Sequence, residues 1–320
     1  MPGKKVLVTG GAGFIGSHVA EAYLQKGFRV WVLDDLSTGR KSNIPDGVEF
    51  VHASVSSAAV GDLFRDAGGF DIVNHHAAQI DVRRSVADPL FDATVNIDGL
   101  LTLVEAGREY GLGRFLFVSS GGVVYGEPDT VPTPEPAPKL PLSPYGVSKL
   151  TSEHYLHYYH RVHGVEYVAM RYSNVYGPRQ DPHGEAGVVA IFSQRLIRGE
   201  KIIIFGDGEQ TRDYVFVEDV VRANMLLSEA ALAPGNSLDS RAFNVGTGVG
   251  TSVNRLAAAL MKISGRREVP IEHVAERRGE LRHSSLAVDK LVGFGWTSRT
   301  SLPDGLAKTF EYIAAKEEGR

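Results

Sequence analysis

The sequence predicts an α/β fold in which a doubly wound parallel sheet is followed by a smaller mixed α/β domain. Three observations support this prediction. Short apolar runs rich in β-branched residues alternate with amphipathic stretches up to Arg171, and a glycine-rich turn joins the first run to the first amphipathic stretch. After Arg171, shorter elements are separated by clusters of glycine, proline and aspartate. Continuous apolar strands that alternate with helices are typical of a parallel sheet covered on both faces, and right-handed crossovers wind such a sheet in two directions.

The hydrophobic periodicity predicts the elements of the first domain, residues 1–171, in order. Strands are expected at residues 6–9, 29–33, 49–51, 71–75, 114–118 and 166–171. Helices are expected at residues 17–26 and 60–67, from Val95 to Tyr110, and from Tyr145 to His163. Seven of the fifteen prolines fall in residues 128–144, which predicts a stiff surface loop.

The second domain is expected at residues 172–320. Its shorter strands are predicted at residues 202–205, 213–217 and 242–245. Segments around residues 213–230 and 242–247 are expected to cross back to the first domain.

The composition limits the classes of function. The chain has 320 residues, of which 43% are hydrophobic and 22% charged, and its formal net charge is −4. It can therefore bury a large core, and it offers no basic block for nucleic acid or an anionic membrane. No apolar run approaches the roughly 18 residues of a membrane span, and the N-terminal apolar stretch is too short for a signal peptide, so we expect a cytoplasmic protein. The absence of cysteine excludes disulfides, thiolate metal sites and a cysteine nucleophile.

The first chemical motif is the glycine-rich turn after the first expected strand. Gly10, Gly13 and Gly16 have the spacing of a dinucleotide-binding turn, which makes the predicted sheet a Rossmann-type sheet. Asp34 ends the second strand, where a carboxylate accepts hydrogen bonds from ribose hydroxyls. Together with Asp35 it would repel a 2′-phosphate, so the motif favours NAD over NADP. The alternative is a structural turn followed by two solvated aspartates.

The second chemical motif opens the longest expected helix. Ser143 is a natural N-cap and Pro144 suits the first helical position, so Tyr145 and Lys149 lie one turn apart on one face. A tyrosine must lower its pKa by about 3 units to act as a base near pH 7, and a nearby ammonium contributes to that shift. The spacing alone is weak evidence, because it recurs at Tyr312 in the C-terminal helix.

A strand ending in two hydroxyls precedes this helix. Residues 115–122 read Phe-Leu-Phe-Val-Ser-Ser-Gly-Gly, which places Ser119 and Ser120 at the carboxyl edge of the sheet. Ligands bind at this edge in doubly wound folds.

Together these residues resemble the extended short-chain dehydrogenase/reductase family. The resemblance is carried by the Thr-Gly-x-x-Gly-x-x-Gly turn, Asp34, His76-Ala77-Ala78, Asn96, Ser119-Ser120 and Tyr145-x-x-x-Lys149. In the second half, the motifs at residues 171–178, 206–208, 212–214 and 243–246 narrow the match to the NAD-dependent sugar epimerase/dehydratase branch. Within that branch the chain is most similar to UDP-glucose (UDP-galactose) 4-epimerases, over residues 4–313.

The resemblance implies a transient oxidation at C4 of a UDP-hexose, with tightly held NAD and no net redox. Tyr145 would take the proton from the sugar O4, with Lys149 and Ser120 as the other catalytic residues, and hydride would leave C4 and return to the other face of a 4-keto sugar. The residues implied for NAD are Gly10, Gly13, Phe14, Ile15, Gly16, Asp34, Asp35, Ala77, Ala78, Gln79, Asn96, Ser119, Tyr145, Lys149 and Tyr172. Those implied for the UDP-sugar are Ser120, Tyr145, Asn174, Val188, Phe205, Arg212, Arg277 and Ser284. No metal is implied.

The implied substrate residues divide by the part of the ligand that they contact. Asn174, Arg212 and Arg277 would hold the diphosphate, because guanidinium groups suit a dianion. Val188 and Phe205 would lie against uracil. The alternatives are that Arg212 pairs with the aspartate that follows it, that the next arginine replaces Arg277, and that the two apolar residues belong to the core.

The sequence departs from the family pattern at Gly121, where a catalytic serine or threonine is usual. Ser120, or Ser119, would then reach the sugar O4, unless Tyr145 works without a hydroxyl partner. The glycine pair also lacks the acidic residues of related 4,6-dehydratases, which argues against dehydration. In the family that the chain resembles, epimerases limited to UDP-glucose and UDP-galactose tend to carry a bulky tyrosine at the position of Ser284. A serine leaves room for an acetamido group, so we expect UDP-GlcNAc and UDP-GalNAc as further substrates.

The helix from Tyr145 to His163 carries a histidine at every third position from His154, with tyrosines between them. Steps of three residues rotate this row around the helix, which favours an aromatic-rich packing surface over a metal site. The resemblance implies a homodimer through this helix and the one from Val95 to Tyr110. Three rival functions are a 4-ketoreductase of the same branch, a UDP-uronate 4-epimerase that uses Arg83 or Arg84, and a non-catalytic NAD-binding scaffold.

Overall fold

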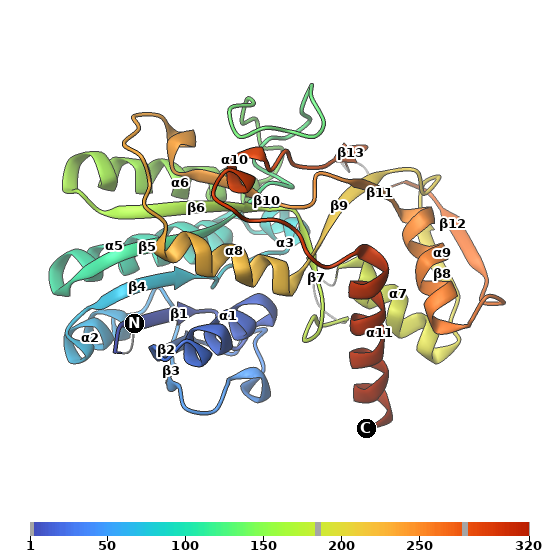
Figure 1. Ribbon diagram of the computed structural model, residues 1–320, viewed down its shortest axis with the longest axis horizontal. Helices are drawn as coiled ribbons and strands as arrows, with labels where there is room; N and C mark the ends of the chain where they lie inside the picture. Colours follow the sequence, from blue (N-terminus) through green and yellow to red (C-terminus); the bar gives the residue numbers. More distant parts are fainter. Residues whose placement is uncertain (1–2, 183–186, 277–280, 320) are drawn as a thin grey trace. The chain divides into compact units, whose positions relative to one another are not determined.

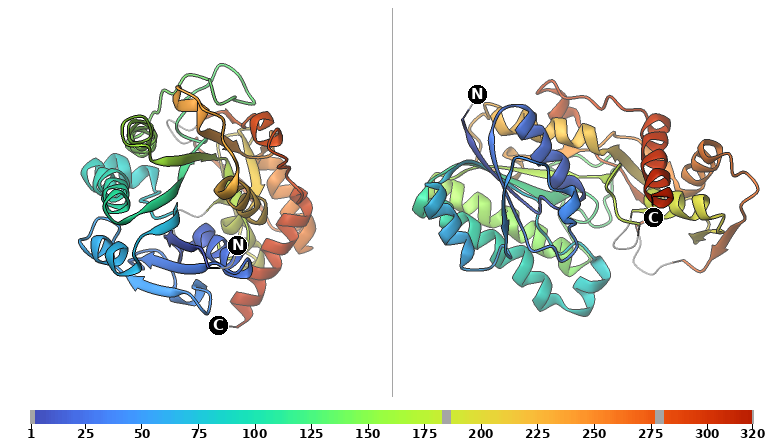
Figure 2. Two further views of the ribbon diagram at one scale, coloured as in Figure 1. Left: turned by 60° about the vertical axis from the view of Figure 1, so that its left-hand side comes forward. Right: turned by 90° about the horizontal axis from the view of Figure 1, so that it is seen from below.

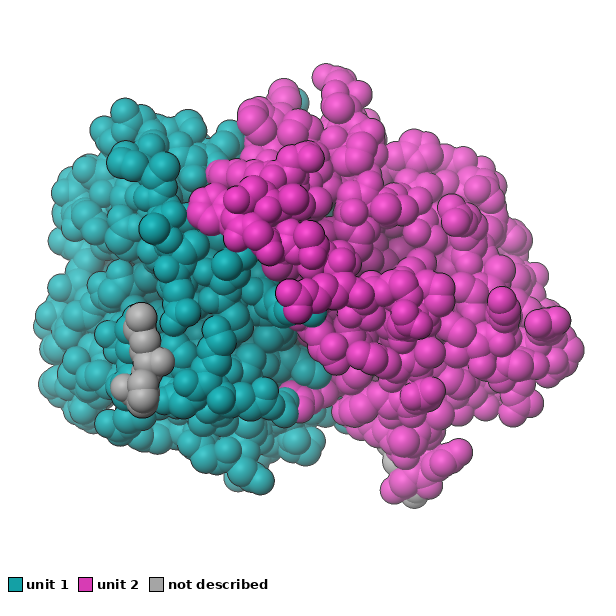
Figure 3. Space-filling model, in the orientation of Figure 1, with its two compact units in different colours: residues 1–125, 139–171, 221–243 teal, residues 126–138, 172–220, 244–320 magenta. Residues whose placement is uncertain are grey.

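The computed structural model describes residues 3–182, 187–276 and 281–319, and the chain divides into two compact units (Figure 3). Unit 1 comprises Met1–Tyr125, Lys139–Arg171 and Val221–Phe243; unit 2 comprises Gly126–Pro138, Tyr172–Val220 and Asn244–Arg320. The loop at Gly126–Pro138, expected with the first domain, groups with unit 2. Its Thr133 explains why, because Thr133 N donates to Ser285 O at 2.8 Å and Thr133 O accepts from Ala287 N at 3.0 Å.

Unit 1 is built on a seven-stranded sheet with the order β10-β6-β5-β4-β1-β2-β3 (Figure 1). Its strands are β1 (Lys5–Thr9), β2 (Arg29–Asp34), β3 (Glu49–His52), β4 (Phe70–His75), β5 (Leu112–Ser120), β6 (Glu166–Tyr172) and β10 (Ala242–Val245). β1 pairs in parallel with β2 and β4, β2 with β3, and β4 with β5. The strand order reverses between β1 and β4, so the expected doubly wound α/β sheet is confirmed.

Helices cover both faces of this sheet (Figure 2). They are α1 (Phe14–Gln25), α2 (Ala59–Ala67), α3 (Val82–Ala87), α4 (Pro89–Ala93), α5 (Gly99–Tyr110), α6 (Pro144–His163) and α8 (Val217–Glu229), with a π-helical turn at Thr94–Asp98 and 3-10 turns at Lys41–Asn43 and Leu238–Ser240. On one face, Asn74 Nδ2 of β4 donates to Tyr23 OH of α1 at 3.3 Å and to Asn224 Oδ1 of α8 at 3.0 Å. On the other, α5 and α6 pack through an apolar core that includes Leu103 and Leu156.

Unit 2 contains a mixed sheet centred on one strand. Its strands are β7 (Asn174–Tyr176), β8 (Ile202–Phe205), β9 (Thr211–Phe216), β11 (Gly250–Ser252), β12 (Ile271–Val274) and β13 (His283–Ser284). β9 pairs in parallel with β7 and β13 and antiparallel with β11, while β8 and β12 form a separate pair. Its helices are α7 (Val188–Arg198), α9 (Val253–Ser264), α10 (Asp289–Val292) and α11 (Leu302–Glu318), of which α7, α9 and α11 pack together.

The observed elements match the expected ones most closely in unit 1. The expected helix from Val95 to Tyr110 is a π-helical turn followed by α5, and the short helices α3 and α4 have no counterpart in the sequence prediction. In the described part of the chain, no helix combines the length and the apolar character needed to cross a membrane.

Candidate active site

The glycine turn after β1 needs residues without a side chain. Gly10 has a φ of +67°, which favours glycine, and a Cβ there would lie 2.6 Å from Ala77 N after β4. A Cβ on Gly16 would overlap the Gly10 carbonyl oxygen. The first glycine therefore allows the strands at the switch point to approach each other, and the third lets α1 pack on the turn.

The start of α1 is open to an anion. Gly13 is its N-cap, and no side chain among the described residues caps the first turn. The helix opens with Phe14 and Ile15, whose backbone N–H groups belong to the set that an α-helix leaves without an internal partner. This geometry and the helix dipole suit a pyrophosphate.

Asp34 ends β2 and lies against the glycine turn. Its Oδ2 accepts from Ala12 N at 2.9 Å and its Oδ1 from Leu36 N at 2.8 Å, while burial raises its pKa. Each oxygen keeps a lone pair that can accept from a ribose hydroxyl. Asp35, in contrast, is exposed and accepts from Ser37 N at 2.9 Å.

A buried network that the sequence does not predict engages Gln79 and Asn96. The carboxylate of Asp92, which is 0% exposed, accepts from Gln79 Nε2 at 2.9 Å, Asn96 Nδ2 at 3.1 Å and Ser148 Oγ at 2.6 Å. Gln79 N also donates to Asn96 Oδ1 at 3.0 Å. Because Ser148 precedes Lys149, this network fixes the start of α6, and the side-chain amides of Gln79 and Asn96 are engaged within the protein.

Tyr145 and Lys149 lie one turn apart at the start of α6. Ser143 caps the helix, since its Oγ accepts from Gly146 N at 3.2 Å. Lys149 Nζ lies 5.8 Å from the centre of the Tyr145 ring and donates to Val118 O of β5 at 2.9 Å. The structure therefore places an ammonium group beside the candidate base.

The charge near Tyr145 comes from Lys149 and not from the two histidines at the end of β4, His75 and His76. Lys149 is 3% exposed, and burial lowers its pKa to about 8, so the group stays largely protonated at pH 7. Burial and the charge of Lys149 together lower the pKa of His76 to about 3 and hold that of His75 well below its usual range. Both imidazoles are therefore neutral at pH 7.

The two hydroxyls at the end of β5 have different environments. Ser119 is 2% exposed and donates to Glu153 Oε1 at 2.6 Å, so its hydroxyl is committed to the protein interior. Ser120 is half-buried, and its hydroxyl makes no hydrogen bond within the described residues. Gly121, which follows, has no side chain to offer. Of the two serines, Ser120 therefore has the hydroxyl that a ligand can use.

In unit 2, three of the expected substrate residues share one face of the small sheet. Arg212 lies in β9, and Ser284 of β13 is its parallel partner. Asn174 of β7 pairs with Tyr214, two residues along β9 from Arg212. Side chains alternate between the two faces along a strand, so Arg212, Asn174 and Ser284 lie on the same side.

Asp213, the alternative partner for Arg212, lies on the opposite face of β9. Its Oδ1 accepts from Thr247 N at 2.8 Å and Thr247 Oγ1 at 2.6 Å, and its Oδ2 accepts from Gly248 N at 3.0 Å and Leu286 N at 3.3 Å. The carboxylate therefore anchors the loop after β10, which the sequence gives no reason to expect.

The remaining expected residues are distributed over both units. Val188 opens α7 and Phe205 ends β8, and both are half-buried. Tyr172 ends β6 and is 4% exposed, and Ala78 follows β4. Arg277 and the arginine after it fall outside the described residues.

The chain matches the model of the NAD dependent epimerase/dehydratase family over residues 6–246. The chain belongs to this family. Over 320 residues it is 44% identical to the UDP-glucose 4-epimerase of Mycolicibacterium smegmatis, covering 98% of this chain and 100% of that one. A crystal structure of the Thermotoga maritima UDP-glucose 4-epimerase with UDP-glucose is 44% identical, with a TM-score of 0.91 and coverage of 98% and 99%. The Thermus thermophilus UDP-glucose 4-epimerase in complex with NAD is 41% identical, with a TM-score of 0.89 and coverage of 97% and 98%.

The cofactor of this NAD dependent epimerase/dehydratase is NAD, and the residues of unit 1 fit it. The glycine turn and the uncapped start of α1 suit its pyrophosphate, and Asp34 keeps acceptor capacity for a ribose. His76 Nε2 is buried without a hydrogen-bond partner among the described residues, which marks a polar atom that a ligand can satisfy.

Proposed function

We propose that this epimerase/dehydratase family member is a UDP-glucose 4-epimerase, which interconverts UDP-glucose and UDP-galactose through a 4-keto sugar. The observation that carries the proposal is the buried Lys149 ammonium beside Tyr145, at the start of a helix that Ser143 caps. The full-length similarity to UDP-glucose 4-epimerases supports the choice of substrate.

In the proposed reaction, the phenolate of Tyr145 accepts the proton of the sugar O4. The Lys149 ammonium favours the phenolate over the phenol by charge, and so makes this proton transfer easier near pH 7. Ser120 donates a hydrogen bond to the sugar O4, or orients the O4 proton toward the Tyr145 phenolate. When bound, NAD supplies the acceptor and then the donor of the hydride at C4. Once the 4-keto sugar presents its other face, Tyr145 returns the proton to O4.

We assign the UDP moiety to residues of unit 2. Arg212 and Asn174 offer a guanidinium fork and an amide on one face of the small sheet, which suits a diphosphate. Arg277 is a further proposed diphosphate contact, and Val188 and Phe205 are proposed to contact uracil. Because a firm hold on UDP leaves the hexose free to turn, this division of roles meets the needs of an epimerase.

Ser284 leads us to extend the proposal to N-acetylated substrates. A serine at this position in β13 is smaller than a tyrosine by an entire aromatic ring, so an acetamido group at C2 has room. The protein should therefore also interconvert UDP-GlcNAc and UDP-GalNAc. Absence of turnover with millimolar UDP-GlcNAc, in a preparation active on UDP-galactose, would refute this extension.

The test is incubation of the purified protein with UDP-galactose and no added NAD, with UDP-glucose as the expected product. A 4-ketoreductase would form none without an added reduced cofactor. Replacing Tyr145 by phenylalanine should lower kcat at least about 100-fold, which is the usual contribution of a general base. Faster turnover of UDP-glucuronate than of UDP-galactose would overturn the substrate assignment.

We also propose that the protein forms a homodimer through α5 and α6. The solvent side of α6 carries apolar side chains that are exposed in the single chain. They are Val147 (49%), Tyr155 (38%), Tyr158 (47%) and Val162 (61%). Exposed apolar side chains gathered on one helix are typical of an interaction surface, which supports the proposal.

A further inference from the structure

The segment between Ser119 and Tyr125 carries Ser120, but its own sequence gives it little stiffness. Gly121 and Gly122 follow Ser120 directly, and glycine has the greatest backbone freedom of any residue. Within the segment, Ser120 O accepts only from Val123 N at 3.3 Å and Val124 N at 3.1 Å among the described backbone hydrogen bonds. A fixed position for the Ser120 hydroxyl therefore requires contacts from outside the segment.

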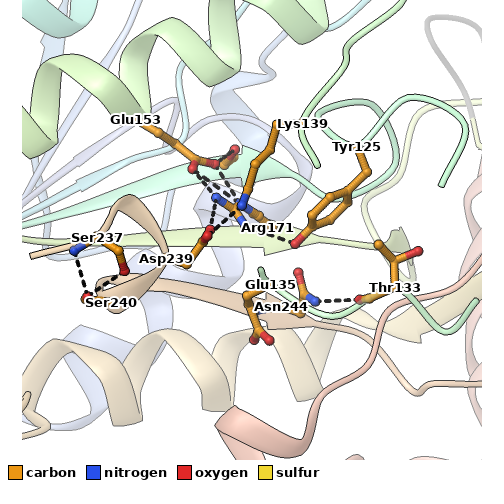
Figure 4. A network of polar contacts seen from close by, with 11 residues as sticks. Tyr125, Thr133, Glu135, Lys139, Glu153, Arg171, Ser237, Asp239, Ser240 and Asn244 are labelled. Atoms are coloured by element: carbon orange, nitrogen blue, oxygen red, sulfur yellow. Dashed lines mark hydrogen bonds and ion pairs between the residues drawn. The ribbon is translucent and has the colours of Figure 1, made fainter. Parts of the chain in front are cut away.

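Both ends of the segment are tied to one buried ion pair. Figure 4 shows the pair and its contact with Tyr125. At the first end, Ser119 Oγ donates to Glu153 Oε1 at 2.6 Å. At the other, Arg171 Nη1 donates to the Tyr125 hydroxyl at 3.0 Å. Glu153 and Arg171 join these ends, since Arg171 Nε donates to Glu153 Oε1 at 3.0 Å and Arg171 Nη2 to Glu153 Oε2 at 2.6 Å.

The ion pair is fully enclosed and balanced in charge. The side chains of Glu153 and Arg171 are both 0% exposed. Arg171 Nη2 also lies 3.0 Å from Asp239 Oδ1, and Lys139 Nζ lies 2.6 Å from Asp239 Oδ2, so two cations face two anions. A buried pair contributes little net stability, because the cost of desolvation offsets the attraction. Its directional hydrogen bonds do, however, fix the orientation of the groups that it holds.

The same pair also belongs to the catalytic helix. Tyr145, Lys149 and Glu153 follow one another at steps of four residues in α6, so they lie along one face of that helix. Glu153 is thus rigidly connected to Tyr145 through the helix backbone and connected to Ser120 through Ser119. The pair therefore links the helix that carries the candidate base to the segment that carries the candidate hydroxyl.

We propose that Glu153 and Arg171 are positioning residues, which hold the Ser120 hydroxyl in register with Tyr145 by anchoring Ser119 and Tyr125. Neither residue of the pair needs to touch the sugar. The inference rests on the proposed function, because it assigns Ser120 a role at the sugar O4. The anchoring also explains how Ser120 can supply the hydroxyl that is usual at position 121, where this chain has glycine.

The sharpest test removes one anchor and leaves the ion pair and the catalytic groups in place. In Ser119→Ala we expect kcat for UDP-galactose to fall about tenfold, which corresponds to about 1.4 kcal/mol in the barrier, while KM stays unchanged. In the protein without substrate, hydrogen exchange at the amides of Val123 and Val124 should become faster. Ser119→Thr, which keeps a hydroxyl, should restore both kcat and the slow hydrogen exchange of these two amides. Ser228→Ala is the matched control, because Ser228 is also a buried serine of unit 1 and donates to Met225 O at 2.9 Å.

A double-variant cycle separates positioning from a general structural effect. If Ser119 acts through Ser120, then Ser119→Ala should lower kcat no further in a Ser120→Ala background. Tyr125→Phe, which removes the anchor at the other end, should behave in the same way. Additive losses in the cycle, an unchanged kcat in Ser119→Ala, or a loss that Ser228→Ala reproduces would each overturn the inference. A wild-type protein without epimerase activity would instead refute the proposed function, while the exchange measurement would still test the anchoring.

Discussion

The ammonium of Lys149 is buried and donates a hydrogen bond to Val118 O at 2.9 Å. Burial disfavours a charged group, and the pKa of Lys149 accordingly falls to about 8 in the folded protein, against about 10.4 in an unfolded chain. Between pH 8 and about 10.4 the unfolded chain binds more protons than the folded protein, so the free energy of unfolding rises with pH in this range. Below pH 8 Lys149 is charged in both states, and the cost of burying its charge no longer changes with pH.

Replacing Lys149 with methionine should therefore make the protein more stable and less active. At pH 7 we expect the free energy of unfolding to rise by up to about 3 kcal/mol, which is the equivalent of the pKa shift. The gain should shrink as the pH is raised from 8 to 10, because wild-type Lys149 loses its charge there. Denaturant unfolding at several pH values measures both effects. A less stable variant at pH 7 would contradict this reading of Lys149.

Asp34 should contribute more to NAD retention than its neighbour. In Asp34→Asn, the amide nitrogen cannot accept from Ala12 N or Leu36 N, and a ribose hydroxyl loses a charged acceptor. A hydrogen bond to a charged group contributes about 1.5–3 kcal/mol, so NAD affinity should fall at least about tenfold in calorimetry. Asp35→Asn is the matched control, because Asp35 is exposed and its effect should be smaller. Equal losses in both variants would contradict the assigned role.

At the scale of elements, one amide holds two segments of unit 2 together. Asn244 in β10 is 0% exposed, and its Nδ2 donates to Thr133 O at 2.9 Å and Ala287 O at 3.0 Å (Figure 4 shows the first). Asn244→Ala removes the donor to the carbonyl groups of Thr133 and Ala287. We expect the free energy of unfolding to fall by about 2–3 kcal/mol. Thermal unfolding measures it, with Asn254→Ala as control, since Asn254 makes two similar bonds in an exposed setting. Equal melting temperatures for the two variants would show that burial adds nothing at Asn244.

The short strand β13 is the element on which substrate size should depend. Ser284 is the cross-strand partner of Arg212, so Ser284→Tyr adds a ring on the face assigned to the substrate. Turnover of UDP-GlcNAc should fall at least about tenfold relative to that of UDP-glucose, since a clash with the acetamido group costs more than about 1.4 kcal/mol. The measurement is the ratio of kcat/KM for UDP-GlcNAc to kcat/KM for UDP-glucose. An unchanged ratio would show that the size of residue 284 does not limit the substrate.

Elements with local signals can be predicted from the sequence. The strands expected at residues 29–33 and 166–171 are β2 and β6, because apolar runs between glycines are visible in a short window. α3 and α4 give no such signal, since helices of six and five residues are too short to show a 3.6-residue period. Only their caps could indicate them, Asp81 for α3 and Asp88 with Pro89 for α4.

The polar networks could not be predicted, because their partners come from distant segments. Asp92 binds Ser148, which is 56 residues away in the chain, and nothing near Asp92 in the sequence shows that its carboxylate is buried. The sequence likewise leaves both Ser119 and Ser120 as candidates for the sugar O4. What separates them is Glu153, 34 residues after Ser119, which takes up the Ser119 hydroxyl.

At the scale of the whole molecule, α6 has two faces with different tasks. Successive residues turn by 100° around a helix, so Val147, Tyr155, Tyr158 and Val162 fall within an arc of about 80°. Tyr145 lies about 120° and Lys149 about 160° from the middle of this arc, outside it. The apolar arc can therefore be covered by a partner without loss of the catalytic groups, and a net charge of −4 per chain is too small to oppose association.

The homodimer proposal predicts that a charge in this arc separates the subunits. Val162→Glu would place a carboxylate in the apolar interface, where an unpaired charge is strongly unfavourable. Light scattering after gel filtration should give twice the mass of the 34.6 kDa chain for the wild type and a shift toward the single chain for this variant. Val249→Glu is the matched control, because Val249 in unit 2 is 60% exposed against 61% for Val162. A monomeric wild type at micromolar concentration, or dissociation by both variants alike, would contradict the assignment of α6 to the interface.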